Sequence, residues 1–347
     1  MKIKLRKLFA VLFVFLLASC GSKEVNKEGN EEKSGKSITK EITIAIPDPQ
    51  NSAIAAATEE FISRVEDYSD GELKLNLSAN GSLYGGDTAA GIKQLSSGSI
   101  DMLVLSTSVY SAFEPGFNMI SVPYMFDDQK QLIDYLNSEV SDDLFSRLEK
   151  MSIKPVGRWT RSFRQITNSK RPIKNVKDLE GLVLRVPNNS LYVEFFKSLG
   201  TVTTPMNFSE VYNALQLNTL DGQENPIDVP LSNNFYEVQK YLSFTNHMAD
   251  AWVVGINSNL YDSLSDKQKQ ALEKAGEEVQ GWNVDMMEKR SEEALKELID
   301  KGMESNELDE SSLNEFVEAS KNLYPEFRKL VEDDELFDKT IEFTGRK

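Results

Sequence analysis

Short apolar runs alternate along most of the chain with segments that have the spacing of amphipathic helices. Residues 72–77, for example, alternate between apolar and polar positions, as a half-buried strand does. The pattern predicts strands over residues 41–46, 72–77, 100–105, 153–157, 182–186 and 252–256, and helices over 54–68 and 87–95. Because strands that alternate with helices form βαβ units, we expect an α/β fold with mostly parallel sheets.

Residues 266–301 have a helical composition and follow Ser265, which is a suitable N-cap. A single helix of this length would extend over roughly 50 Å, more than one small domain needs. Two interpretations remain. The segment forms either two ordinary helices with a kink at Gly281 or one long helix that joins two lobes.

The first residues have the pattern of a bacterial lipoprotein signal. A basic start is followed by an apolar run over 8–18, which is too short to span a bilayer as a stable helix. Residues 17–20 read Leu-Ala-Ser-Cys, and Cys20 is the only cysteine of the chain, so no internal disulfide can form. We therefore expect a signal peptide over 1–19 and lipidation of Cys20. The alternative is an ordinary secretory signal with a chance cysteine.

The segment after the cysteine is polar and rich in Gly, Ser, Lys and Glu. Such a composition buries too little apolar surface to fold, so residues 20–40 are predicted to be a flexible tether. The protein is then expected to be extracytoplasmic and held at the membrane by a lipid anchor, in the periplasm or at the outer cell surface.

The charge of the chain excludes one class of partner. The sequence has 39 basic and 55 acidic residues, and the predicted signal peptide contains four of the basic ones and no acidic residue. Its removal changes the net charge from −16 to −20. Nucleic acid is therefore not an expected partner, since phosphates require a basic face. An anionic ligand would need a few locally placed cations.

The sequence offers little for catalysis. His247 is the only histidine, which removes Ser-His-Asp triads, Cys-His dyads and the usual zinc sites. Phosphate-binding glycine motifs are also absent from the sequence. Paired carboxylates could support glycosidase chemistry, but no pair stands out. We therefore expect that the protein is not an enzyme and that it has neither a cofactor nor a metal site.

Arginines at strand ends are the positive signal. Arg185 lies at the end of the apolar run 182–186, where open α/β sheets place their ligands. Arg161 and Arg164 follow the predicted strand 153–157. A guanidinium matches a carboxylate in a bidentate way, which lysine cannot do. The alternative for any one arginine is a surface salt bridge, but Arg185 stands in an apolar strand.

Several long motifs occur in a fixed order from about residue 41 to the end. They cover residues 82–87, 95–101, 162–172, 178–188, 204–216, 221–226, 235–241 and 245–247, and include Asp-Leu-Glu-Gly-Leu-Val-Leu-Arg-Val-Pro-Asn at 178–188 and Asp-Gly-Gln-Glu-Asn-Pro at 221–226. On these motifs the chain resembles the extracytoplasmic solute-binding subunit of a tripartite ATP-independent periplasmic (TRAP) transporter, of the DctP-type family.

The resemblance implies a fold and partners. The fold is the two-lobe, periplasmic-binding-protein-like α/β fold of class II type, with a hinge and a long helix that touches both lobes. Lobe I is expected over 41–160 plus about 250–288, and lobe II over about 161–249 plus 289–347. The expected partners are a small organic acid and the small and large membrane subunits of the transporter. A sensor or an ABC-type binding lipoprotein for a small anion is the alternative.

The resemblance also implies site residues. Arg185 matches the arginine that holds the ligand carboxylate, Arg164 matches a second ligand-facing arginine, and Asn225 matches a cleft asparagine. The further predicted ligand-binding residues are Arg161, Asp87, Ser106 and Trp252.

Relatives that bind sialic acid carry a glutamate and an arginine in the segment that matches 106–109. This chain has Ser-Thr-Ser-Val there. Sialic acid is therefore not the expected ligand. Arg161 next to Arg164, Trp159, Trp252 and the Ser/Thr-rich segment 106–108 suit a ligand with hydroxyls or a second carboxylate. We expect a sugar acid (hexuronate or aldonate), with a C4-dicarboxylate next.

Overall fold

The computed structural model describes residues 39–346. The predicted signal peptide over 1–19, the predicted lipidation site Cys20 and most of the predicted tether over 20–40 lie outside these residues. The first strand begins at Lys40, so the last residue assigned to the tether belongs to the fold. None of the helices within 39–346 is long and apolar enough to cross a bilayer.

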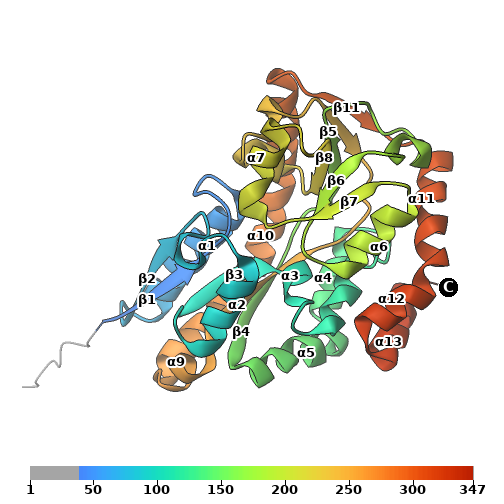
Figure 1. Cartoon of the computed structure of the whole chain (residues 1–347). Coiled ribbons are helices and arrows are strands. Elements are labelled where there is room, and N and C mark those ends of the chain that lie inside the picture. The colour runs from blue at the N-terminus through green and yellow to red at the C-terminus, as the bar shows by residue number, and fades with distance from the viewer. Residues whose placement is uncertain (1–38, 347) are drawn as a thin grey trace, which may run out of the picture. The chain divides into compact units, whose positions relative to one another are not determined.

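Two mixed sheets carry the fold (Figure 1). The first has the strand order β2-β1-β3-β10-β4. Its strands are β1 Lys40–Ala45, β2 Leu73–Ser78, β3 Met102–Ser106, β4 Ile153–Thr160 and β10 Ala251–Asn257. The second sheet has the order β11-β9-β5-β8-β6-β7. Its strands are β5 Gln165–Asn168, β6 Val183–Val186, β7 Val202–Pro205, β8 Gly222–Asn225, β9 Tyr241–Phe244 and β11 Glu304–Glu307.

Each sheet contains one strand that is antiparallel to both of its neighbours. In the first sheet this strand is β10, and in the second it is β5; the other pairs are parallel. Both strands come directly after the chain has passed from one sheet to the other, through residues 161–164 and 245–250. Because the chain enters each of these strands directly from the other sheet, without a crossover helix, the strand runs opposite to its neighbours. The expectation of mostly parallel sheets did not include these two antiparallel strands.

Helices connect and cover these strands. They are α1 Ala53–Tyr68, α2 Thr88–Ser97, α3 Thr107–Tyr110, α4 Gln129–Leu136, α5 Glu139–Ser146, α6 Ser190–Ser198, α7 Val211–Gln216, α8 Asp228–Ser232, α9 Ser258–Asp262, α10 Asp266–Asp300, α11 Glu310–Asn322, α12 Tyr324–Val331 and α13 Asp334–Thr344. One buried apolar cluster includes Leu105 of β3 and Leu184 of β6, so both sheets contribute to a common core. Phe327 of α12 and Phe337 of α13 belong to the same cluster.

The helix α10 is continuous through Gly281, so the prediction of one long helix is confirmed and the alternative of two helices is wrong. Ser265 is its N-cap and forms a capping box with Gln268, as its position before the helical run predicted. Its first half packs with the core of the first sheet through Ala275 and Val279. Its second half packs through Ala294 and Leu298 against Leu242 of β9.

The division of the chain into two lobes, with the boundaries given above, stays a prediction. The segment 289–347 was expected in lobe II. Its helices α12 and α13 pack against the 3-10 helix η2 (Pro115–Ser121) of the segment expected in lobe I, and α12 also packs against α6.

Two glycines of α10 give a matched test of how this helix packs. A Cβ atom on Gly276 would lie 1.6 Å from the carbonyl oxygen of Val156 in β4, whereas a Cβ on Gly281 would meet no atom within 4 Å. We expect Gly276→Ala to lower the free energy of unfolding by about 1–3 kcal/mol or more, since it overpacks the helix against the sheet. Gly281→Ala should raise it by about 0.5–1 kcal/mol, because alanine favours the helix. Urea denaturation measures both, and equal effects would contradict the close approach.

Candidate ligand-binding site

Residues from both sheets line one buried cavity. Its free space is about 60 Å³, which is room for a few water molecules, so the walls lie close together in this structure. Its wall consists of Pro47, Asp48, Thr88, Leu105, Ser106, Ser108, Val109, Arg161, Arg164, Arg185, Pro187, Phe208, Asn225 and Trp252. Six of the seven predicted ligand-binding residues are therefore brought together: Ser106, Arg161, Arg164, Arg185, Asn225 and Trp252.

Strand ends supply most of these side chains. Ser106 is the last residue of β3, and it lies opposite Trp252 of the antiparallel strand β10. Asn225 is the last residue of β8, and Arg185 stands one residue before the end of β6. Where strand ends from two sheets meet, backbone pairing stops and side chains of distant segments converge.

Arg185 is buried and has no carboxylate partner. Its side chain donates from Nε and Nη2 to the carbonyl oxygen of Met206, at 3.1 and 2.7 Å, and lies 5.8 Å from the ring centre of Phe208. Within residues 39–346 no Asp or Glu oxygen lies within 4.0 Å of it. Burial lowers the pKa of Arg185 to about 10; nearby Glu224 opposes this and Arg164 adds to it. The guanidinium is still charged at neutral pH, and a buried charge without a counter-ion favours binding of an anion.

Arg164 is also buried, but the protein itself neutralises it. Its Nε donates to the carboxylate of Glu224 and its Nη1 donates to Asp250 Oδ2 at 3.0 Å. Its Nη2 donates to Glu224 Oε1 at 2.9 Å and to Asn225 Oδ1 at 3.0 Å. Burial alone would lower the pKa of Arg164, but the charge of Glu224 and the other partners raise it. In this structure Arg164 holds the cavity wall in place and orients Asn225.

Arg161 shares the carboxylate of Asp250 with Arg164. Its Nη1 donates to Asp250 Oδ2 at 2.8 Å, and its guanidinium lies 5.3 Å from the ring centre of Trp252. The Nε of Arg161 is buried without a hydrogen-bond partner among the described residues. Ser106 belongs to the same group, because its Oγ donates to the carboxylate of Asp250 at 2.7 Å. Asp250 therefore joins three of the predicted site residues.

A buried histidine supports Glu224 from outside the cavity lining. His247 Nε2 lies 3.2 Å from Glu224 Oε2, and its Nδ1 lies 2.7 Å from Thr245 Oγ1. Burial lowers the pKa of His247 although Glu224 opposes the shift, so the ring is neutral and the contact is a hydrogen bond rather than an ion pair. Burial alone would raise the pKa of Glu224, but Arg164 and His247 overcome this effect and lower it.

Sequence reasoning missed three carboxylates. Glu224 and Asp250 lie beneath the arginines, and Asp48 lines the cavity just after β1. A signal for Asp48 was present, because it follows an apolar strand between Pro47 and Pro49, a placement comparable to that of Arg185 before Pro187. Nothing in the neighbouring residues marked Glu224 or Asp250 as partners of the arginines.

Asp87 is the predicted site residue that does not line the cavity. It is the N-cap of α2, and its Oδ1 accepts hydrogen bonds from the backbone N–H groups of Ala89 and Ala90 at 2.9 and 3.1 Å. Its neighbour Thr88 reaches the cavity instead. In this structure the carboxylate of Asp87 begins a helix.

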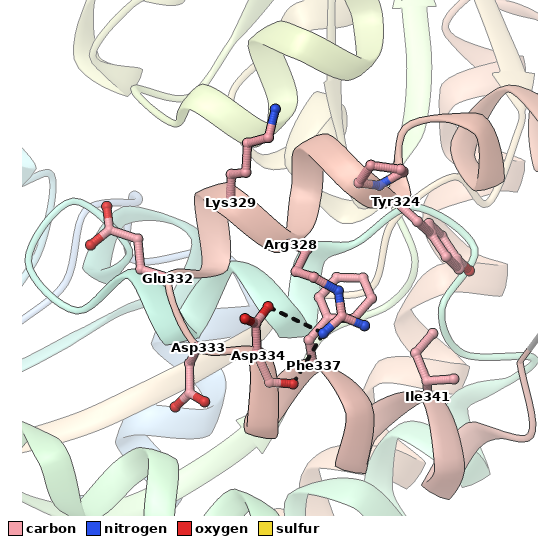
Figure 2. Close-up of a pocket in the computed structure, with 9 residues that line it drawn as sticks. Tyr324, Arg328, Lys329, Glu332, Asp333, Asp334, Phe337 and Ile341 are labelled. Atoms are coloured by element: carbon pink, nitrogen blue, oxygen red, sulfur yellow. Dashed lines mark hydrogen bonds and ion pairs between the residues drawn. The ribbon is translucent and has the colours of Figure 1, made fainter.

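A wider hollow lies at the surface of α12 and α13. Figure 2 shows Arg328 between Asp334 and the ring of Phe337. Arg328 Nη1 pairs with Asp334 Oδ1 at 3.2 Å, and Lys329 Nζ pairs with Glu326 Oε2 at 2.7 Å. Because the cations of this hollow already have carboxylate partners, we place the ligand site in the cavity around Arg185.

Within 39–346 no three His, Cys, Asp or Glu side chains are grouped so that they could hold a metal ion. The cavity offers hydrogen-bond donors, hydroxyls, one amide, aromatic faces and the carboxylate of Asp48, a set suited to binding a small polar anion that also has hydroxyls.

Comparison with known proteins agrees with this geometry. The family model of bacterial extracellular solute-binding protein, family 7 (DctP), matches residues 45–330. The chain is 33% identical over 248 residues to the 2,3-diketo-L-gulonate-binding periplasmic protein YiaO of Escherichia coli. The match covers 72% of this chain and 75% of that protein. It is 28% identical over 318 residues to the C4-dicarboxylate-binding protein DctB of Bacillus subtilis, and the match covers 92% of this chain and 89% of that protein.

The structure is similar to solved structures as well. It superimposes with a TM-score of 0.84 on the sugar acid binding protein DctPAm of Advenella mimigardefordensis in complex with galactonate. The two sequences are 27% identical, and the match covers 89% of this chain and 98% of that one.

Proposed function

Because the chain belongs to bacterial extracellular solute-binding protein family 7, the DctP family of TRAP transporters, we propose that its cavity captures a small organic acid through the guanidinium of Arg185. The observation that carries this proposal is the burial of Arg185 without an anionic partner among the described residues. A ligand carboxylate would supply the missing negative charge in a bidentate geometry. The desolvated surroundings would strengthen that ion pair relative to water.

We favour a sugar acid, such as a hexuronate or an aldonate. Two of the related proteins bind acids of this class, 2,3-diketo-L-gulonate and galactonate. The cavity also offers groups suited to hydroxyls, namely Thr88, Ser108 and Asn225, and the face of Trp252. Aromatic faces and small polar side chains are typical of sites for polyhydroxylated ligands.

A C4-dicarboxylate is the second candidate. The observation in its favour is the relative DctB, which binds C4-dicarboxylates and is similar to almost the whole chain. Against it stands the charge of the cavity. Arg161 and Arg164 already contact Asp250 and Glu224, so one arginine remains for two carboxylates.

We further propose how the captured acid is delivered. The two lobes would close about the segments 161–164 and 245–250, and the closed form would dock on the small and large membrane subunits. Lipidation of Cys20 would hold the protein at the membrane. The mass of the mature amino terminus tests the anchor, since an unmodified cysteine would contradict it. Neighbouring genes for an ATPase or a histidine kinase, instead of two membrane subunits, would favour the ABC-type or sensor alternative.

Thermal denaturation with a panel of organic acids tests the binding proposal. At a ligand concentration of about a thousand times Kd, binding adds about 4 kcal/mol to the free energy of unfolding. For large domains this raises Tm by about 2–4 °C per kcal/mol. We expect hexuronates or aldonates to produce the largest shift. Stabilisation by dicarboxylates alone would contradict the favoured class, and no shift with any acid would contradict the function. Recovery of the bound acid unchanged would distinguish a receptor from an enzyme.

A further inference from the structure

Asp48 is a buried acid in the cavity wall that the proposed capture of one carboxylate does not use. Asp48 is buried, with 6% of its surface exposed. Its Oδ1 accepts a hydrogen bond from Asn233 Nδ2 at 3.4 Å, which is longer than a normal N–H···O bond. Among residues 39–346 no Lys, Arg or His nitrogen lies within 4.0 Å of its carboxylate. A buried carboxylate with so little support favours a hydrogen-bond donor from the cavity.

Two of the charged residues that line the cavity, Asp48 and Arg185, have no oppositely charged group within 4.0 Å among residues 39–346. The negative charges of Glu224 and Asp250 are in contact with the positive charges of Arg164 and Arg161. What remains is one cation, Arg185, from the second sheet, and one anion, Asp48, from the loop after β1 in the first sheet. A ligand that suits both carries one carboxylate and, at another position, a hydroxyl that can donate a hydrogen bond.

From this arrangement we infer that Asp48 determines specificity, by accepting a hydrogen bond from a ligand hydroxyl and repelling a second ligand carboxylate. The inference rests on the proposed capture of an acid by Arg185 and narrows its substrate class. Polyhydroxy monocarboxylates are accepted, whereas dicarboxylates of the same length are rejected. The rejection is electrostatic, since two carboxylates in one desolvated site cannot both stay ionised without a large cost.

The ionisation of Asp48 makes this selection depend on pH. Burial raises the pKa of Asp48 to about 6. The negative charge of Asp228 in α8 adds to this rise, whereas the charges of Arg161 and Arg164 and the hydrogen bond from Asn233 oppose it. Tyr84 also faces the carboxylate, and burial and Asp48 keep the tyrosine neutral by raising its pKa. At pH 7.5 Asp48 is ionised and repels a second carboxylate. At pH 5 it is mostly protonated, and it can donate to that carboxylate instead.

Calorimetric titration with D-galactonate and galactarate tests the inference. The two acids share the hydroxyls at C2 to C5, and galactarate has a second carboxylate in place of the terminal CH₂OH group. At pH 7.5 we expect the protein to bind galactonate at least about tenfold more tightly than galactarate. Asp48→Asn should reduce this ratio by about tenfold or more, because the like-charge repulsion between Asp48 and the second carboxylate is removed. From pH 7.5 to pH 5 galactarate should bind more tightly to the unchanged protein but not to Asp48→Asn.

The control is Asp285→Asn, which removes the same charge from an exposed position on α10 and should leave the ratio unchanged. Equal binding of both acids, or an unchanged ratio in Asp48→Asn, would overturn the role of Asp48 and leave capture by Arg185 intact. The same pH dependence in Asp48→Asn would assign the selection to another acid such as Asp228 and also overturn the inference. Failure of both acids to bind would overturn this inference, whereas the proposed function is overturned only if no organic acid of the thermal panel binds.

Discussion

Replacing Arg185 with methionine is expected to weaken binding of the ligand carboxylate by about a hundredfold to ten-thousandfold. The lost interaction is a bidentate pair, in which each charge-assisted hydrogen bond contributes about 1.5–3 kcal/mol, and every 1.4 kcal/mol or so corresponds to a factor of ten in Kd. The ligand-free protein should lose little stability. Removing an unpaired buried charge offsets the loss of the hydrogen bonds to the carbonyl oxygen of Met206. Calorimetry and urea denaturation measure the two effects separately.

Arg171→Met is the matched control. Arg171 also donates to backbone carbonyl oxygens, those of Asp178 and Glu180 at 2.8 Å each, but it does not line the cavity. Binding should be unchanged in this variant. If Arg185→Met retained an affinity within about tenfold of the original, the carboxylate anchor would have to lie elsewhere in the cavity.

Replacing Asp250 with alanine is expected to lower the free energy of unfolding by about 3–5 kcal/mol, the usual effect of leaving a buried charge without its partner. The carboxylate of Asp250 is fully buried and accepts hydrogen bonds from Arg161 Nη1 at 2.8 Å and Arg164 Nη1 at 3.0 Å. It also accepts from Thr107 Oγ1 and from the backbone N–H of Ala251. The variant therefore weakens the support of two buried cations at once. Urea denaturation of the ligand-free protein measures the loss.

The comparison for Asp250 is Asp142→Ala. Asp142 pairs with Arg158 Nη2 at 2.5 Å, but its side chain is 61% exposed. Water can solvate Arg158 after the change, so this variant should alter stability little. Similar losses in the two variants would show that Asp250 does not hold the cavity together.

Much of the fold could be predicted from local patterns. The alternation of residues 72–77 and the apolar run 100–105 correspond to β2 and β3 within one or two residues, and Ser265 marks the start of α10. The family resemblance supplied the two-lobe fold, which the match to the family confirms. The pairing direction of β5 and β10 could not be predicted, because it depends on where the chain passes from one sheet to the other.

The site was predictable in position but not in electrostatics. Arg161, Arg164 and Arg185 have equivalent placements near strand ends, so sequence reasoning treated all three as candidates for the ligand. The structure separates them. Arg164 contacts Glu224, which is 60 positions away in the chain, and Asp250, which is 86 positions away. Arg161 reaches the same Asp250 over 89 positions. Arg185 has no such partner in the described chain.

The sequence by itself determined the α/β alternation, the long helix and the strand-end arginines, because periodicity, capping and composition are properties of neighbouring residues. It also led to the predicted signal peptide and lipid anchor at Cys20. Only the tertiary structure decided which charges cancel and which remain free, leaving Arg185 as a cation and Asp48 as an anion in one cavity. The reason is physical: the state of a buried charge depends on burial and on partners within a few ångströms, and folding brings those partners from distant parts of the chain.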